Sequence, residues 1–247
     1  VLDAASQRDF EITEDNYNDT TVLSATILDT PISISVNKYA IGGSTQLSGA
    51  VLGLYRAGDT AYANCLERWT TGTTAHKISS DKLAAGNEYM IHEISAPKGY
   101  TVIPEDVRFK VNSNGTVTYT GTAGSEYGTA SGTSVTIRDK AYSLSVSKVG
   151  ISADASQPTA PLSGASISLI DDETGNVVHT FTSTNQVYEV PNSVLTGPLN
   201  GKEYHYYTIH ENSAPGGYAL ADDIKIAVDA AGHVYKTDAQ GNKVNDQ

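Results

Sequence analysis

Two sets of ionisable residues occupy matching places in the two halves of the chain, and their types could together form an amide bond. In chain order the sets are Lys38, Glu93 and Asp139, then Lys148, Glu211 and Asp246. The lysine and the aspartate are 101 residues apart in the first set (139 minus 38) and 98 apart in the second (246 minus 148). The glutamate lies between them in both. This repeated spacing predicts one kind of site that is built twice.

The chemistry follows from burying one amine with two carboxyl groups. A fully charged cluster keeps one uncompensated negative charge, which is costly in an apolar interior. Burial raises the pKa of a carboxyl group and lowers that of an amine, so a proton is expected to move. A neutral lysine can then attack a protonated aspartate while the glutamate shuttles protons and water leaves. Fixed geometry is worth roughly 7–11 kcal/mol of barrier in the best cases. The alternative is a buried salt-bridge triad without a covalent step.

The two glutamates lie in a repeated motif, YMIHEISAPKGY at 89–100 and YTIHENSAPGGY at 207–218. Nine of its twelve positions match. Tyr89, Ile91 and Glu93 alternate along the first copy, so in a strand they face the same side. The glutamate is therefore expected to point into an apolar layer, where it needs a partner. The Ala-Pro-x-Gly-Tyr half ends the strand, because proline withholds a ladder donor and glycine permits a turn.

The lysines and aspartates are expected on strands of the same alternating kind. Apolar residues at every second position of segments 32–38 and 144–148 lead into the lysine. Segments 135–139 and 244–246 place an apolar residue two positions before the aspartate in the same way. All three members of each set are thus predicted to face a core. For the second set, this pattern favours Asp246 over its neighbour Asn245.

Many short alternating strands, turn signals between them and no helical period predict an all-β protein of tandem β-sandwiches. The 247 residues divide into segment 1–30, a first sandwich at 31–140 and a second at 141–247. The 15 tyrosines outnumber phenylalanine and tryptophan together, as in many extracellular β proteins. Cys65 is the only cysteine, so no disulfide can form within the chain. We expect its side chain to be buried or half-buried.

Charge and motif content exclude several partners. The net charge of −12 disfavours nucleic acid and anionic membrane surfaces. No apolar run is long enough to cross a membrane and no signal peptide is present, so we expect a mature or excised fragment. The acidic runs lack a calcium-loop pattern, and His92 and His210 have outward parity, which indicates surface residues rather than metal ligands. No cofactor or metal is predicted.

These motifs resemble the collagen-adhesin B-type (Cna-B-like) domains of Gram-positive pilins and adhesins. The resemblance covers residues 31–247 and rests on the lysine strand (SVNKYA, SVSKVG), the following LSGA, the glutamate motif and the closing strand with its acid. In that family the glutamate motif is called the E-box. The resemblance implies a seven-stranded immunoglobulin-like sandwich with a spontaneous isopeptide bond assisted by the E-box glutamate. The implied bonds are Lys38–Asp139 with Glu93 and Lys148–Asp246 with Glu211.

The resemblance implies a structural protein, a pilus shaft or adhesin stalk segment in the cell wall or pilus of a Gram-positive bacterium. Its expected partners are other pilin or surface-protein subunits, and its only catalysis is its own cross-linking. The alternative is an adhesin module that binds a host matrix protein or glycan through loops 56–82 or 121–134, with Trp69 and Tyr62 as candidate contacts. The chain has no sortase sorting signal and no recognisable pilin-motif lysine.

The opening segment 1–30 ends in ATILDTP, which resembles VTIRDKA at 135–141. One interpretation makes it the last two strands of an upstream domain, with Asp29 as an acid whose lysine and glutamate lie outside this chain. The other is a plain N-terminal extension that packs on the first sandwich. An unpaired hairpin would expose its edges and would be expected to find a partner.

Overall fold

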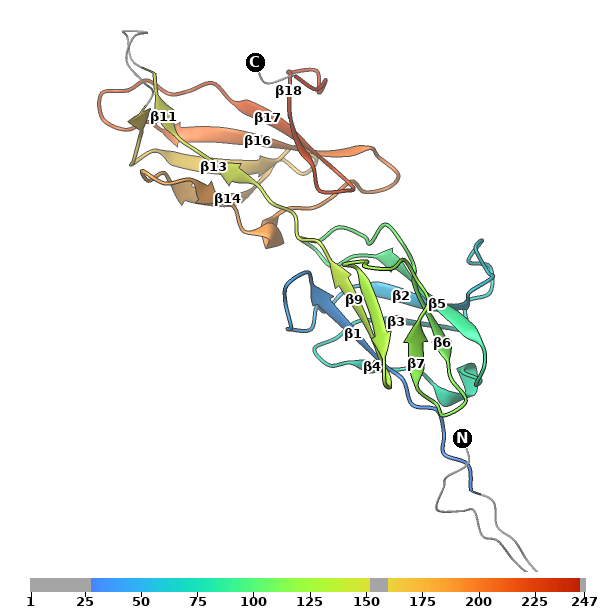
Figure 1. Ribbon diagram of the computed structural model, residues 1–247. Coiled ribbons are helices and arrows are strands. Elements are labelled where there is room, and N and C mark those ends of the chain that lie inside the picture. The colour runs from blue at the N-terminus through green and yellow to red at the C-terminus, as the bar shows by residue number, and fades with distance from the viewer. Residues whose placement is uncertain (1–27, 152–159, 245–247) are drawn as a thin grey trace, which may run out of the picture. The chain divides into compact units, whose positions relative to one another are not determined.

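The computed structural model of the protein describes residues 28–151 and 160–244 (Figure 1). The chain forms two compact units, which are described separately. Strands dominate both, and within the described ranges the only helical elements are two short 3₁₀ turns, Ser80–Lys82 and Asn192–Val194. The prediction of an all-β fold built from tandem sandwiches is therefore confirmed.

The first sandwich has two sheets. Its strands are β1 (Ser35–Ala40), β2 (Val51–Arg56), β3 (Glu67–Thr70), β4 (His76–Lys77), β5 (Glu88–Ser95), β6 (Val107–Val111), β7 (Val117–Tyr119), β8 (Gly128–Ser131) and β9 (Ser134–Asp139). One sheet has the order β3-β2-β5-β6-β7, and the other has the order β4-β1-β9-β8. The repeated glutamate motif begins on β5, at the centre of the larger sheet. The lysine and aspartate strands, β1 and β9, are neighbours in the smaller one.

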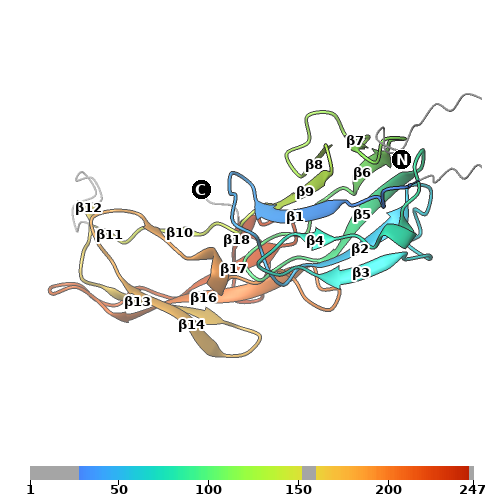
Figure 2. The same cartoon turned by 90° about the horizontal axis from the view of Figure 1, so that it is seen from below.

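Strands β1 and β9 run parallel. The Ser35 N–H donates to the Thr133 carbonyl and the Ile41 N–H donates to the Asp139 carbonyl, each at 2.9 Å. Residue numbers increase together across these two bonds, which is the pattern of a parallel pair. Figures 1 and 2 show the two strands side by side. The first and last strands of this sandwich are thus joined directly.

Side-chain burial in these strands follows the predicted period of two. In β9 every second residue is buried, which places Val135, Ile137 and Asp139 inside. In β1 the buried residues are Val36 and Lys38. Apolar residues of the facing sheet complete the core, including Leu52, Leu54, Tyr89, Ile91 and Phe109. The charged groups therefore lie at the end of otherwise apolar rows, as the sequence predicts.

A threonine hydroxyl ties β2 to β3 at a buried point. The Thr71 Oγ1 accepts a hydrogen bond from the N–H of fully buried Ala50 at 3.0 Å. Ser183 does the same for Ala165 in the second unit, also at 3.0 Å.

We expect Thr71→Val to lower the free energy of unfolding by about 1–3 kcal/mol, because it leaves a buried donor without its acceptor. Urea denaturation measures the loss, and Thr70→Val at the exposed neighbouring position should change little. Equal effects at the two positions would contradict this assignment.

The second unit has one large sheet and two small ones. Its strands are β10 (Ser145–Val146), β11 (Val149–Gly150), β12 (Ala160–Pro161), β13 (Ser166–Asp171), β14 (Asn176–Thr182), β15 (Tyr188–Glu189), β16 (Tyr204–Ser213), β17 (Ile224–Asp229) and β18 (Val234–Thr237). The large sheet has the order β14-β13-β16-β17-β18, and its strands β13 and β16 lie side by side in both views (Figures 1 and 2). The small sheets are β10-β15 and β11-β12.

Tyr142 belongs to the apolar core of the second unit with Leu144, Leu195 and Tyr207. Burial raises the pKa of Tyr142 from 10.0 to about 12, with the nearby Tyr207 phenol as a further cause. The raised pKa favours the protonated form in the folded protein. Tyr142 therefore contributes stability that is complete below about pH 10 and is lost as the pH rises towards 12.

We expect Tyr142→Phe to flatten the fall in stability between about pH 10 and pH 12, because the substitution removes this titration. Urea unfolding at a series of alkaline pH values measures the slope. Tyr218→Phe, at a position whose side chain is exposed, serves as the control. An unchanged alkaline slope in Tyr142→Phe would count against the argument.

Val244, at the end of the described chain, does not face the core as its alternation with Asp246 predicts. Val244 was predicted as the counterpart of Ile137, which is fully buried, but it is 42% exposed. Its N–H donates to the Lys236 carbonyl at 2.9 Å, so this segment pairs back onto β18. The cause is a tight turn in which Asp238 accepts hydrogen bonds from the backbone N–H groups of Gln240, Gly241 and Asn242. Within the described residues, β10 accordingly pairs with β15 alone.

Candidate functional site

Lys38 and Glu93 form an ion pair in the interior of the first sandwich. The Lys38 Nζ lies 2.7 Å from the Glu93 Oε1, and the two side chains are only 1% and 0% exposed. Lys38 comes from β1 and Glu93 from β5, which belong to different sheets. The pair therefore joins the two layers across the core. A charge pair so deeply buried is costly to desolvate and is weak evidence for stability by itself.

The backbone around Lys38 is held by the segment that follows it. The Leu47 N–H donates to the Lys38 carbonyl at 2.7 Å, and the Gln46 Oε1 accepts from the Lys38 N–H at 3.0 Å. In the second unit, the Leu162 N–H donates to the Lys148 carbonyl at 2.9 Å. Leu47 and Leu162 are the first residues of the two LSGA motifs. This motif thus fixes the lysine backbone in both units.

Asp139 is the third buried ionisable residue of the first set. It is the last residue of β9 and is 0% exposed. Its strand pairs with β1, which carries Lys38, and its own carbonyl accepts from Ile41, three residues beyond that lysine. The sheet thus places the lysine strand and the aspartate strand in adjacent positions. All three predicted residues of the first set are inside the protein.

The second unit builds the same lysine–glutamate pair. The Lys148 Nζ lies 3.1 Å from the Glu211 Oε1 and 3.2 Å from its Oε2. The side chains are 15% and 5% exposed, so this pair is less enclosed than the first. The Glu211 Oε2 also accepts a hydrogen bond from the Ala221 N–H at 2.6 Å. Asp246, the predicted acid of this set, lies outside the described residues.

Each E-box tyrosine has a phenol oxygen that holds the preceding loop. The Tyr89 oxygen accepts from the Ala84 N–H at 2.8 Å, and the Tyr207 oxygen accepts from the Thr196 N–H at 2.7 Å. In the first unit Arg56 also donates to the Tyr89 oxygen, at 2.9 Å. Burial raises the pKa of Tyr207 above its ordinary value. These contacts explain why the motif begins with tyrosine rather than with phenylalanine.

Two histidine–aspartate pairs next to the glutamates were missed by the sequence reasoning. His92 and His210, which were expected to be plain surface residues, each bind a carboxylate. The His92 Nδ1 is 2.9 Å from the Asp106 Oδ1, and the His210 Nδ1 is 2.7 Å from the Asp223 Oδ1. The signal was present in the repeat, because an aspartate follows each histidine by 13 or 14 residues. Among the described residues, no three histidine, cysteine, aspartate or glutamate side chains are grouped so that they could hold a metal ion.

The two residues suggested for ligand contact, Trp69 and Tyr62, each stack on a histidine. Trp69 is buried on β3 and stacks on His76 with ring centroids 4.3 Å apart. Tyr62 stacks on His92 at 3.9 Å. Cys65, expected to be buried or half-buried, is exposed, because it lies in the irregular connection between β2 and β3. Asp29, the acid of the opening segment, is exposed as well, and residues 1–27 lie outside the described part.

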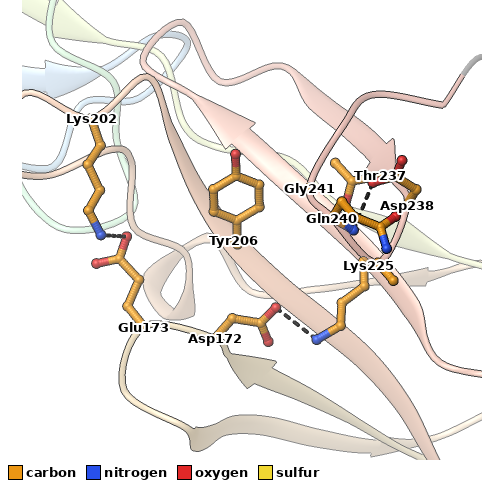
Figure 3. A pocket seen from close by; sticks show the side chains of 10 residues that line it. Asp172, Glu173, Lys202, Tyr206, Lys225, Thr237, Asp238, Gln240 and Gly241 are labelled. Carbon is orange, nitrogen blue, oxygen red and sulfur yellow. Dashed lines mark hydrogen bonds and ion pairs between the residues drawn. The ribbon is translucent and has the colours of Figure 1, made fainter.

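A polar pocket of about 440 Å³ opens on the second unit. Figure 3 shows Tyr206 between two ion pairs, Glu173 with Lys202 and Asp172 with Lys225. Each positive charge at this pocket thus has a carboxylate beside it at 3.0–3.1 Å. The pocket does not include loops 56–82 or 121–134, which the sequence had suggested for ligand binding.

This protein consists of two successive all-β units. In each unit an inward lysine pairs with the glutamate of a repeated strand motif. The family model described as the SpaA prealbumin-like fold domain matches residues 32–124 and 143–243. The chain therefore belongs to this family, in agreement with the resemblance to pilin domains inferred from its motifs.

Several solved structures are similar to this chain. The pilus adhesin SpaC from Lactobacillus rhamnosus GG, in its open conformation, is 20% identical with a TM-score of 0.45, and the match covers 87% of this chain but only 28% of the adhesin. The shaft pilin SpaA from the same organism is 15% identical with a TM-score of 0.35, over 81% of this chain and 94% of the pilin. The Bacillus anthracis TIE protein is 18% identical, with a TM-score of 0.37 over 80% and 31% of the two chains.

No curated protein matches the sequence. No helix among the described residues is long and apolar enough to cross a membrane.

Proposed function

We propose that this chain is a structural segment of a Gram-positive surface fibre, a pilus shaft or adhesin stalk, whose units are stabilised by self-formed Lys–Asp isopeptide bonds. The observation that carries the proposal is the enclosed Lys38–Glu93 pair, with buried Asp139 on the strand next to that lysine. Membership in the SpaA domain family agrees with it. An enclosed set of one amine and two acids is hard to justify as a salt bridge, because one negative charge stays uncompensated.

The proposed reaction starts with proton redistribution in the first sandwich. The Lys38 amine loses a proton and the Asp139 carboxyl gains one, which the apolar surroundings favour because they disfavour isolated charges. The neutral Nζ attacks the Asp139 Cγ, and a carbon–nitrogen bond forms. Glu93 then moves a proton from nitrogen to the departing oxygen, the carbon–oxygen bond breaks, and one water leaves. The product is one amide and one water, and no oxidant or cofactor is needed.

Glu93 is suited to this role by its position. Its Oε1 lies 2.7 Å from the attacking nitrogen, within the range for direct proton transfer. Because both groups are fixed on strands of the same sandwich, the reaction is effectively intramolecular. Glu93 is returned unchanged, while the amide removes both charges of its partners from the core. The chain thereby catalyses its own cross-linking and has no proposed activity on other molecules.

The second unit is proposed to use Lys148 and Glu211 in the same roles, with Asp246 as the acid. The support is the matching Lys148–Glu211 pair and the Ala221 N–H that holds the glutamate oxygen. Both units also fix the lysine backbone through the LSGA leucine. We also propose that the two sandwich domains span residues 31–140 and 141–247.

The cross-link gives the segment a mechanical role. In the first unit it would join the opening and closing strands, so tension would pass through a covalent bond. The expected location is outside the cell, in the wall or pilus, with other pilin or surface-protein subunits as partners. Binding of a host protein or glycan through loops 56–82 or 121–134 has weaker support, because Trp69 is part of the core.

Intact-mass measurement tests this proposal directly. Every Lys–Asp amide makes the chain lighter by one water than its sequence. Peptide mapping then identifies the two residues that are joined. A chain with the full sequence mass would refute the cross-link and leave a buried salt bridge in its place.

A further inference from the structure

Each E-box histidine forms a cross-strand pair at the point where a strand ladder ends. In the second unit β16 and β17 are paired from Tyr204↔Asp229 to Ile209↔Ile224. The next residues in this register are His210 and Asp223, and their side chains meet at 2.7 Å. The first unit repeats the arrangement, because the β5–β6 ladder ends at Ile91↔Val107 and His92 then meets Asp106.

The chain between the paired residues is the loop that reaches the glutamate. In the second unit this loop runs from Ser213 to Ile224, and the Ala221 N–H within it donates to the Glu211 Oε2 at 2.6 Å. Ala221 is two residues before Asp223, and Glu211 is one residue after His210. The histidine–aspartate pair therefore closes the base of the loop whose backbone binds the carboxylate. Ile103 has the same place in the loop after β5, ten residues after Glu93, and it is buried.

We propose that His92 with Asp106, and His210 with Asp223, are positioning residues for isopeptide formation. Each pair fixes the register at which the loop leaves the sheet, and the loop in turn orients the glutamate towards the lysine. The inference rests on the proposed cross-linking function and names residues that serve it. Neither the histidine nor the aspartate touches the reacting atoms, so their effect is on the orientation of the glutamate.

Surrounding contacts in the first unit reinforce this pair. The Asp106 Oδ2, which is not the oxygen that His92 contacts, accepts from the Tyr62 hydroxyl at 3.2 Å, and the Arg108 Nη2 lies 3.7 Å from the same oxygen. Tyr62 in turn stacks on the His92 ring at 3.9 Å, with Tyr55 near both rings. In the second unit the His210 and Asp223 side chains are 43% and 49% exposed. An exposed cross-strand pair contributes little to stability, so a strong effect on the reaction would reveal a positioning role.

The test follows bond formation during folding of the full chain. The protein is purified unfolded from inclusion bodies and folded by dilution, and the Lys38–Asp139 peptide is quantified against time by mass spectrometry. We expect His92→Ala to slow this bond about 10–100-fold, because displacements near 1 Å can cost that much in rate. His92→Asn should restore most of the rate, since its amide N–H can donate in place of Nδ1. Lys82→Ala removes an exposed ion pair of the same unit and should leave the rate unchanged.

The outcomes separate the two proposals. If the parent chain forms no bond, the cross-linking function itself is refuted. If the parent forms the bond and His92→Ala forms it equally fast, the positioning role is refuted. Failure of His92→Asn to recover the rate in a folded variant, shown by circular dichroism, would also overturn it. Should His92→Ala not fold, Asp106→Leu tests the same pair, because leucine has a similar shape but no acceptor for the His92 Nδ1–H. It should slow the bond as well, and an unchanged rate in the folded variant would refute the positioning role.

Discussion

The intact chain is expected to weigh two waters less than its sequence, and Glu93→Ala and Glu211→Ala should each restore one of them. The physical reason is that each glutamate moves the proton that lets water leave, so without it the lysine and aspartate stay apart as separate side chains. High-resolution mass spectrometry of the denatured protein measures the deficit. Denaturation is useful here, because it removes every non-covalent contact and leaves the amides.

Glu88→Ala is the matched control for this experiment. Glu88 lies on the same strand as Glu93 but is exposed, so its loss should leave the deficit of two waters unchanged. A deficit of one water in the parent would limit the chemistry to one unit, and peptide mapping would show which. A parent mass equal to that of the sequence would eliminate the isopeptide proposal for both.

Loss of the first cross-link is expected to lower the free energy of unfolding by about 4–5 kcal/mol, the value for closing a loop of about 100 residues in the chain-entropy treatment of disulfides. Lys38→Arg is the informative change, because a guanidinium keeps the positive charge opposite Glu93 but does not act as the nucleophile. Urea denaturation measures the difference, and the susceptibility of the folded chain to protease should rise in parallel.

Lys77→Arg provides the comparison, because Lys77 is exposed on β4, the strand beside β1. Its stability should match that of the parent. If Lys38→Arg proved as stable as the parent while its mass showed the bond missing, the cross-link would have no thermodynamic role. If Lys38→Arg kept the deficit of two waters, the lysine assignment would be wrong.

The alternation of the sequence was enough to predict the strands and the inward direction of the charged residues. Val36 and Lys38 on one strand, and Ile137 and Asp139 on another, are buried as their parity requires. The E-box strand is equally predictable, because Tyr89, Ile91 and Glu93 face the core. An alternation of apolar residues with a period of two is a strong signal of which side chains face the core, wherever one face of a sheet is buried.

Pairings between distant strands could not be predicted from the same pattern. The parallel contact between β1 and β9 depends on how the whole sandwich closes. Val244 has the parity of a closing strand, yet a tight turn brings it back to β18 instead. The histidine–aspartate pairs were missed for a related reason, since outward parity does not reveal which neighbouring strand supplies a partner.

The parallel pairing of β1 and β9 has a consequence for how far the first sandwich can be stretched. In a parallel pair the start of β1 and the end of β9 lie at opposite ends of the ladder, so pulling on them shears all of its hydrogen bonds together. Without a covalent bond, rupture would release the chain from Lys38 to Asp139, and about 100 residues at 3.3–3.6 Å each correspond to roughly 340 Å of extended polypeptide. With the amide in place, the residues between Lys38 and Asp139 cannot be pulled out into an extended chain. A fibre of such units would therefore lengthen little under load.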